Sequence, residues 1–161
     1  PELIVVSSCS KNFGLYRERT GALSLICETA EATAAATTLL AAAARANYSM
    51  PPDHGAAIVQ TIMESPELTS DWDAELKEIR DRINSLRALL VARLRSAGVD
   101  RDFSFIEKEK GMFSFLGVNK DQIQTLIQQY SIYLVGSSRI NIASINDDNI
   151  DYLVESIKAV L

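Results

Sequence analysis

The sequence predicts an α/β protein in two parts. Residues 1–69 form part of a larger sheet-containing domain, and residues 70–161 form a long connecting helix and a small α+β carboxy-terminal domain. Two apolar runs of strand length, at 3–6 and 22–27, predict strands near the start of the chain. A stripe of large apolar residues spaced by three and four predicts the long helix. Short strand-like and helix-like segments then alternate to the end of the chain.

The two predicted strands flank a polar stretch that runs from Ser7 to Gly21. Both runs lack polar alternation, which is typical of strands covered on both faces, and open α/β sheets of that kind bind ligands at the carboxyl ends of their strands. We therefore expect Lys11 to lie on a loop at the end of a buried strand.

Two helices are expected before the long one. Thr29 is a suitable N-cap for an alanine-rich helix over 30–46, whose small side chains suit close packing. Pro51 and Pro52 start a second helix, which ends before Pro66.

The long helix is predicted from a capping box of Ser70 with Asp73 to a C′ glycine, Gly98. Its charged residues, such as Glu75 and Arg82, are interpreted as a solvated face. The residues of its apolar stripe are Trp72, Leu76, Ile79, Ile83, Leu86, Leu90 and Leu94.

The small domain is expected to contain short elements only. They are a hairpin of strands around 103–105 and 113–115, a helix opened by Asn119 and Gln122, short strands at 133–135 and 139–143, and a last helix capped by Asn146.

Composition excludes several classes of protein. The formal net charge is -5, and no lysine or arginine cluster stands free of acidic residues, which argues against a nucleic-acid surface and an anionic membrane surface. No segment is long and apolar enough to span a bilayer. The single histidine, His54, has no neighbouring ligands for a metal site, and no nucleophile-elbow motif supports a hydrolase.

The cysteines predict a cellular compartment, and the start of the sequence predicts a longer protein. Cys9 and Cys27 are too few for a disulfide framework, so we expect both to be buried thiols in a reduced, cytoplasmic protein. The sequence begins without methionine, almost directly in a strand, and we expect it to be the carboxy-terminal part of a longer protein.

The residues around Lys11 predict a reactive amine beside a phosphate site. Arg17 and Arg19 are nearby positive charges, and like charge with burial lowers the pKa of a lysine toward the neutral amine that Schiff-base chemistry requires. Serine hydroxyls at 7, 8 and 10 and an arginine guanidinium suit phosphate oxygens. This combination indicates pyridoxal phosphate.

Four ordered blocks of sequence extend this prediction. The segment Ser8-x-Ser10-Lys11-Asn12-Phe13-Gly14-Leu15-Tyr16, continued by Arg19 and Gly21, resembles the lysine segment of the aspartate and aromatic amino-acid aminotransferases, which are fold type I pyridoxal phosphate enzymes. The resemblance continues through 45–52, 111–115 and 138–143 and so covers the whole chain. It implies that residues 1–69 are the end of the large coenzyme-binding domain.

The resemblance implies a role for each candidate residue of the coenzyme site. Lys11 would hold the coenzyme as an internal aldimine and then move the proton between the substrate α-carbon and the coenzyme in a ping-pong transamination. Ser8 and Arg19 would bind the coenzyme phosphate.

The resemblance also implies the substrate site. Arg139 would bind the α-carboxylate, and Phe113 would line the pocket. Arg45 would reach into the neighbouring subunit of a homodimer to bind the distal carboxylate of a dicarboxylic substrate. Two positions depart from the family, because Ser138 stands where glycine is usual and Met50 where asparagine is common.

Three hypotheses remain open from the sequence. The first is a cytoplasmic, dimeric aminotransferase that acts on aspartate or aromatic amino acids and a 2-oxo acid such as 2-oxoglutarate. The second is a truncated, folded piece without catalytic activity by itself. The third is another lysine-dependent pyridoxal phosphate enzyme, a lyase or decarboxylase, in which Arg45 would have no natural role.

Overall fold

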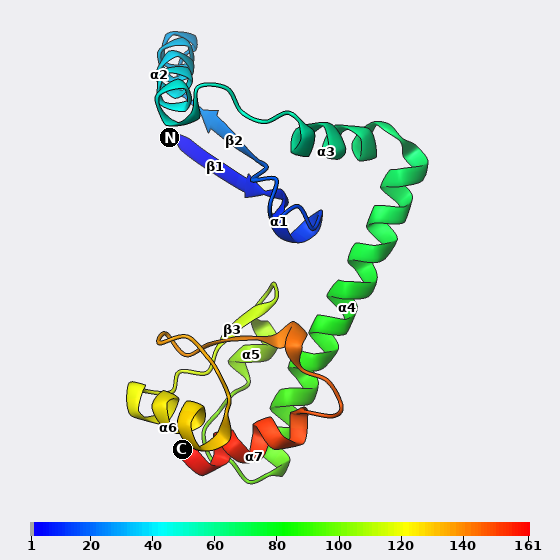
Figure 1. The fold of residues 1–161 in the computed structure, drawn as a ribbon, viewed down its shortest axis with the longest axis vertical. Coiled ribbons are helices and arrows are strands. Elements are labelled where there is room, and N and C mark those ends of the chain that lie inside the picture. Colours follow the sequence, from blue (N-terminus) through cyan, green and yellow to red (C-terminus); the bar gives the residue numbers. More distant parts are fainter. Residues whose placement is uncertain (1) are drawn as a thin grey trace. The chain divides into compact units, whose positions relative to one another are not determined.

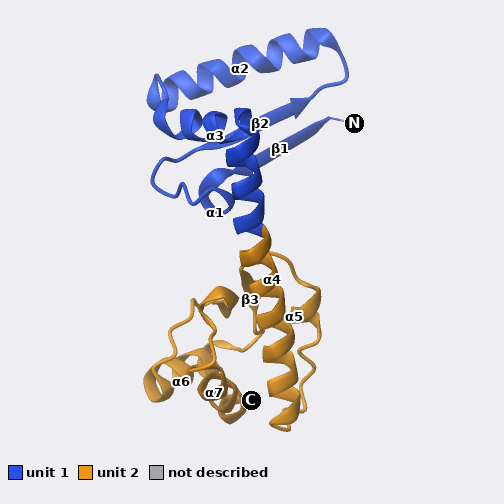
Figure 2. Cartoon of the chain, turned by 90° about the vertical axis from the view of Figure 1, so that its right-hand side faces the viewer, with its two compact units in different colours: residues 1–76 blue, residues 77–161 orange. Residues whose placement is uncertain are grey.

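The computed structural model describes residues 2–161 and divides the chain into two compact units at Leu76 and Lys77 (Figure 2). We call the residues up to Leu76 unit 1 and those from Lys77 unit 2. Figure 1 gives the order of the elements along the chain. Within the described part, no helix combines the length and the apolar character that a membrane crossing needs.

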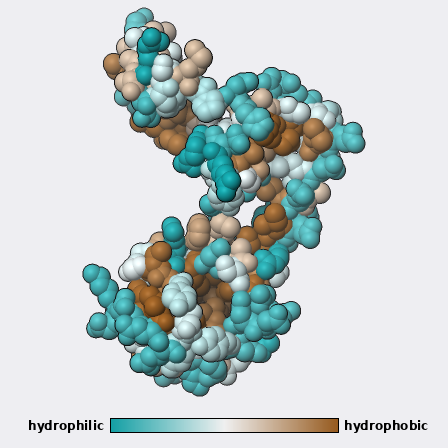
Figure 3. Space-filling view, viewed as in Figure 1, coloured by the Kyte–Doolittle hydropathy of each residue, from teal (hydrophilic) through white to brown (hydrophobic). Residues whose placement is uncertain are grey.

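Unit 1 contains one pair of antiparallel strands. Strand β1 (Leu3–Ser8) pairs with β2 (Gly21–Ile26), and the register runs from Leu3 opposite Ile26 to Ser8 opposite Gly21. Both predicted strands are confirmed, but the prediction that they are buried is wrong for the described residues. Every residue of β1 is exposed, because no layer of residues 2–161 covers the apolar side chains. Hydrophobic side chains accordingly lie at the surface of this unit in Figure 3.

One helix of unit 1 begins where the sequence predicts, and two other segments differ from the predictions. Lys11 lies in a short helix, α1 (Cys9–Asn12), and not on a loop. Helix α2 (Ala30–Tyr48) begins as predicted, with the Thr29 hydroxyl accepting from the Ala32 amide at 3.1 Å. Helix α3 (His54–Glu64) begins two residues after the proline pair. Cys9 and Cys27 are free thiols that are half-buried and not fully buried.

The long helix, α4 (Pro66–Ser96), begins earlier than the predicted capping box. Pro66 occupies its first turn, and the Ser65 hydroxyl accepts from the Leu68 amide at 3.3 Å. Proline is favoured there because the amide that it lacks has no partner within the helix. Ser70 is therefore inside the helix, and its predicted role as the N-cap is wrong.

The end of α4 is the predicted one. Gly98 has a positive φ of 77°, its amide donates to the Arg95 carbonyl at 3.0 Å, and the Val99 amide donates to the Leu94 carbonyl at 3.2 Å. These two hydrogen bonds form a Schellman motif, which a glycine at C′ favours.

Unit 2 differs from the predicted arrangement at its strands. Residues 103–105 do not pair with 113–115, because the Asp102 carboxylate accepts from the Ser104 amide at 2.8 Å and the chain continues into a short helix, α5 (Phe105–Lys108). Strand β3 (Phe113–Phe115) instead pairs antiparallel with β4 (Arg139–Asn141), which is followed by the 3-10 helix η1 (Ile142–Ser144). The predicted strand at 133–135 is absent.

Two further helices complete unit 2. Helix α6 (Lys120–Tyr130) begins with the predicted capping box of Asn119 and Gln122. Helix α7 (Ile150–Val160) follows a turn in which Asn146 accepts from the amides of Asp148 and Asn149, so Asn146 caps the turn and Asn149 is the N-cap.

The hydrophobic core of the described residues lies entirely in unit 2. Among residues 2–76, only Gly55 is buried. The predicted stripe of α4 is buried from Ile83 onward, whereas Ile79 is exposed. The core consists of Ile83, Leu86, Leu90, Val91, Leu94, Phe103, Ile106, Leu116, Val118, Ile123, Leu126, Ile142, Ile145, Ile150, Val154 and Ile157.

Candidate active site

Lys11 follows the carboxyl end of β1. The Ser8 hydroxyl caps α1 by accepting from the Ser10 amide at 3.2 Å, and it donates to the Ser10 hydroxyl at 3.0 Å. The exposed Lys11 ammonium lies 4.2 Å from the centroid of the Tyr16 ring, within the range of a cation–π contact. The amine is therefore held at the surface, one helical turn from the Ser8 cap.

Arg19 is brought to the same end of the strand pair. The Cys9 amide donates to the Thr20 carbonyl at 3.0 Å, and this bond continues the ladder beyond the last strand pair, Ser8 with Gly21. The Arg19 guanidinium is exposed, and its Nη1 donates to the Tyr16 carbonyl at 3.1 Å. Ser8, Lys11 and Arg19 thus lie on one short stretch of structure at one end of the sheet.

The start of α3 packs against the Arg19 turn, which the sequence did not predict. Arg19 has a positive φ of 53°, which is unfavourable for a residue with a β-carbon. His54 Nδ1 lies 3.0 Å from the Glu18 carboxylate. A β-carbon on Gly55 would lie 2.0 Å from the Thr20 hydroxyl, so only glycine fits against this turn.

Aromatic side chains hold the end of α1. The ring of Phe13 stacks on that of Trp72 with centroids 4.7 Å apart, and the Trp72 indole donates to the Asn12 carbonyl at 2.7 Å. The residue after Lys11 is therefore bonded to the first turns of α4.

Arg45 lies in the last turn of α2, and its side chain is exposed. Among residues 2–161, no carboxylate lies within 4 Å of its guanidinium. Met50, one of the two departures from the family, is 82% exposed in the segment that follows α2. The described residues of unit 1 thus give the Arg45 guanidinium no carboxylate partner.

Unit 2 brings together the two remaining predicted site residues. The Arg139 guanidinium lies 4.5 Å from the centroid of the Phe113 ring. Both residues line a cavity of about 380 Å³ whose other walls are mainly apolar and aromatic, including Tyr133, Leu134 and Tyr152. No carboxylate of the described chain pairs with Arg139, so this exposed cation faces the cavity without an ionic partner.

Ser138, the other departure from the family, fits its position. It has a φ of 62°, in the left-handed region that favours glycine, and its side chain is buried. Its hydroxyl accepts from the Gly117 amide at 2.8 Å, and its carbonyl accepts from the Leu116 amide at 3.0 Å. The added side chain therefore brings, through its hydroxyl, a hydrogen bond that glycine cannot make, and Arg139 remains exposed.

A metal centre has no support in the described part of the chain, where no group of three or more histidine, cysteine, aspartate or glutamate side chains could hold an ion.

A family model described as aminotransferase class I and II matches residues 1–157. The chain belongs to this aminotransferase family. An aspartate aminotransferase of Salmonella typhi is 49% identical over 160 residues, which are 99% of this chain and 40% of that protein. An aromatic-amino-acid aminotransferase of Paracoccus denitrificans is 46% identical over 158 residues, again 40% of its length.

Solved aminotransferase structures have the same fold. The aromatic-amino-acid aminotransferase of Burkholderia pseudomallei, covalently bound to pyridoxal phosphate, matches with a TM-score of 0.88 and 46% identity over 98% of this chain and 40% of that one. A second structure, an aromatic amino acid aminotransferase with 3-indolebutyric acid, matches with a TM-score of 0.92 and 44% identity. The chain thus spans about two fifths of the length of the aminotransferases that it matches.

Proposed function

We propose that this chain is part of an enzyme that transfers amino groups between an amino acid, aspartate or aromatic, and a 2-oxo acid such as 2-oxoglutarate, with pyridoxal 5'-phosphate as coenzyme. The observation that carries the proposal is Arg139, an exposed guanidinium on the wall of an apolar cavity, beside the Phe113 ring and without an ionic partner among residues 2–161. Such a group suits an anionic substrate with an apolar body.

In this proposal three residues of unit 1 hold the coenzyme. The donor set fits it, because an amine, a hydroxyl and a guanidinium occur together at one end of the β1–β2 pair. Lys11 binds the coenzyme aldehyde covalently, and Ser8 and Arg19 donate to its phosphate oxygens. When bound, the coenzyme supplies an electron sink for the electron pair left on the substrate α-carbon. The Lys11 amine would take up and return the proton of the substrate α-carbon.

Arg139 and Phe113 position the substrate in this proposal. A bidentate guanidinium holds the α-carboxylate in one plane and so fixes the direction of the bond from the α-carbon to its hydrogen. The Phe113 ring, 4.5 Å from that guanidinium, restricts the carboxylate to the open side. The two half-reactions of a ping-pong cycle use the same site, first for the amino acid and then for the 2-oxo acid.

Arg45 binds the distal carboxylate of dicarboxylic substrates in the neighbouring subunit of a homodimer. Its exposure at the end of α2, without a carboxylate partner in the described chain, is consistent with a partner outside the protomer. We also propose that residues 1–69 belong to the large coenzyme-binding domain, that residues 70–161 form the connecting helix and the small domain, and that the protein is cytoplasmic, as its free thiols favour.

Two measurements test this function in a chimera in which the chain replaces the matching 40% of the Salmonella typhi relative. Borohydride reduction and peptide mapping should place the pyridoxyl label on Lys11, and a label on Lys77 or Lys120 would refute that role. Arg139→Ala should weaken all amino-acid substrates, and Arg45→Ala should weaken aspartate far more than phenylalanine. Loss of a charged hydrogen-bond partner costs about 2 to 5 kcal/mol. Equal losses for aspartate and phenylalanine in the Arg45 variant would contradict the distal-carboxylate role.

The second candidate is that the 161-residue chain by itself is a folded piece without activity. The exposed strands of unit 1 favour it, because their apolar side chains and open edges suit further pairing more than a finished active site. A lyase or decarboxylase is the third candidate. A larger loss for aspartate than for phenylalanine in Arg45→Ala would argue against it.

A further inference from the structure

Arg87 is a buried charged residue that the sequence did not single out. It lies on α4 with only 1% of its surface exposed. Burial of a guanidinium is costly unless its donors are satisfied and its charge is balanced. The Glu109 carboxylate lies 3.4 Å from Nη1, so one anion balances the charge. The two terminal nitrogens make the remaining hydrogen bonds, all to uncharged groups, and Nε has no hydrogen-bond partner among the described residues.

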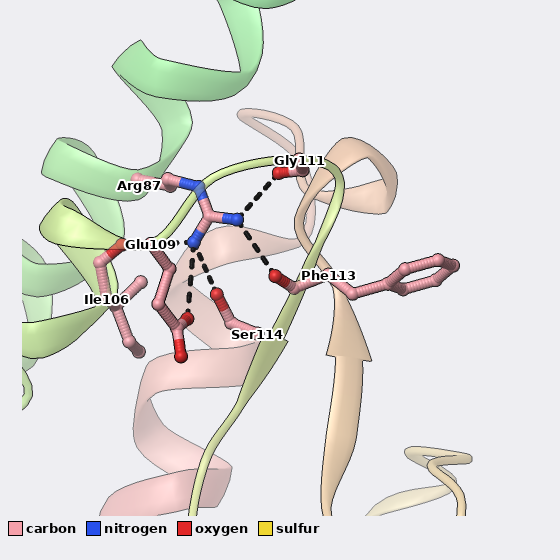
Figure 4. Close-up of polar contacts among 6 residues, drawn as sticks. All are labelled: Arg87, Ile106, Glu109, Gly111, Phe113 and Ser114. Atoms are coloured by element: carbon pink, nitrogen blue, oxygen red, sulfur yellow. Dashed lines mark hydrogen bonds and ion pairs between the residues drawn. The ribbon is translucent and has the colours of Figure 1, made fainter. Parts of the chain in front are cut away.

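These hydrogen bonds go to α5, to the turn that follows it and to the first residues of β3 (Figure 4). Nη2 donates to the carbonyls of Gly111 at 2.6 Å and Phe113 at 2.9 Å. Nη1 donates to the Ile106 carbonyl at 3.0 Å and to the buried Ser114 hydroxyl. One planar side chain on a long helix thereby fixes both ends of the turn before a strand of only three residues.

Arg87 and Arg139 lie on opposite faces of the same strand pair. Ser114 is opposite Ile140 in the register, whereas Phe113 is opposite Asn141 and Phe115 is opposite Arg139. Successive side chains of a strand point to opposite faces, and paired residues share a face. The Ser114 face therefore contacts Arg87, and the other face carries Phe113 and Arg139.

We propose that Arg87 is a positioning residue for the substrate-carboxylate site, an inference that rests on the proposed function of Arg139. Arg87 hydrogen-bonds the Phe113 carbonyl and the Ser114 hydroxyl and so fixes the position and tilt of β3 relative to α4. The ladder to β4 and the contact between the Phe113 ring and the Arg139 guanidinium then set where Arg139 presents its fork. Arginine suits this position because its planar fork reaches acceptors on two sides, whereas the lysine ammonium is a single point.

The test uses the chimera described above, with Arg87→Lys as the perturbation. Arg93→Lys is the matched control, since Arg93 lies on the same helix with an exposed ion pair to Asp151. The substrates are phenylalanine and 2-phenylethylamine, which share a ring and an amine but differ in the carboxylate. Binding of succinate, which cannot react, is measured by calorimetry.

We expect Arg87→Lys to lower kcat/KM for phenylalanine about 100-fold, the loss that a displacement near 1 Å produces. The rate with 2-phenylethylamine should stay within about threefold, and so should both rates in Arg93→Lys. Succinate should bind about tenfold more weakly. In an Arg139→Ala background, Arg87→Lys should add no further selective loss. If Arg87→Lys does not fold, Ser114→Ala replaces it, with an expected selective loss of about fivefold.

The outcomes separate the two proposals. If Arg139→Ala does not distinguish phenylalanine from 2-phenylethylamine, the proposed role of Arg139 is wrong and the positioning role falls with it. If Arg139→Ala distinguishes them but Arg87→Lys lowers both rates equally, or retains its full effect in the Arg139→Ala background, Arg87 serves the core alone and the inference is overturned.

Discussion

Two leucine-to-alanine substitutions of the 161-residue chain should differ widely in their effect on stability. Leu90, on α4, has 0% of its surface exposed, and Leu39, on α2, has 71% exposed. Replacing a fully buried leucine removes its transfer free energy and leaves a cavity, so Leu90→Ala should lower the free energy of unfolding by about 2 to 5 kcal/mol. Leu39→Ala removes little buried surface and should change the free energy of unfolding by less than about 0.5 kcal/mol.

The assay is urea denaturation followed by two signals. Far-UV circular dichroism reports the helices of both units, and fluorescence reports Trp72, the single tryptophan of the chain, which lies in unit 1. Because Gly55 is the one buried residue among the described residues of unit 1, the fluorescence transition should come at lower urea than the main dichroism transition. Leu90→Ala should shift the dichroism transition only.

One result would refute this reasoning. A loss of 2 kcal/mol or more in Leu39→Ala that does not depend on protein concentration would mean that unit 1 has a core of its own. A loss that grows as the protein concentration is raised and disappears on dilution would instead indicate that a second copy of the chain covers α2, since association stabilises the folded chain more at higher concentration.

Two further predictions concern the same chain. The isolated chain should show no transaminase turnover with aspartate, 2-oxoglutarate and excess pyridoxal phosphate, and a rate above ~1 per second would contradict the second candidate function. Hydrogen bonds from the Ser104 amide and hydroxyl hold the pKa of Asp102 below its ordinary value of 3.8. Its stabilising contribution is therefore complete at pH values above 3.8 and is lost as the pH falls below that, so Asp102→Asn should destabilise the chain at pH 7 and match the wild type in strong acid, as thermal melts at both pH values would show.

Local signals in the sequence predicted local structure well. The capping box at Asn119 and Gln122 and the Schellman glycine, Gly98, are confirmed, because their hydrogen bonds join residues within one turn. The predicted start of α4 was wrong by more than one turn, because Ser65 followed by Pro66 competes with Ser70 and a proline at the first position is the stronger signal.

Pairing over longer distances was not predictable from local patterns. The aromatic alternation around Phe103 and Phe113 reads as a hairpin, yet β3 pairs with Arg139–Asn141, and a turn at Asp102 removes the first strand. Nothing in the spacing of these residues specifies a partner that follows more than twenty residues later. The prediction of buried strands in unit 1 failed because burial depends on neighbours that the run of apolar residues does not contain.

The candidate site residues were predicted from motifs, whereas the buried Arg87 that contacts the strand beside them was not. Arg87 lies four residues after Ile83 and three before Leu90, which places it within the apolar stripe of α4. That spacing was the available signal for a buried arginine. Its acceptors, which are mainly backbone carbonyls, have no signature in the sequence.

The hydrogen bond of Ser138 makes the effect of substitutions in this segment depend on the order in which they occur. The conformation of Ser138, with a φ of 62°, favours glycine, and its hydroxyl is the acceptor of the Gly117 amide. When that hydrogen bond is present, replacing Ser138 by glycine removes the unfavourable backbone conformation but leaves the Gly117 amide without its acceptor. The replacement therefore has a cost in stability as well as a gain. The effect of exchanging glycine and serine at position 138 therefore depends on which substitutions residue 117 and its turn have already acquired. Relatives with either residue can share one backbone while differing in which neighbouring substitutions each tolerates.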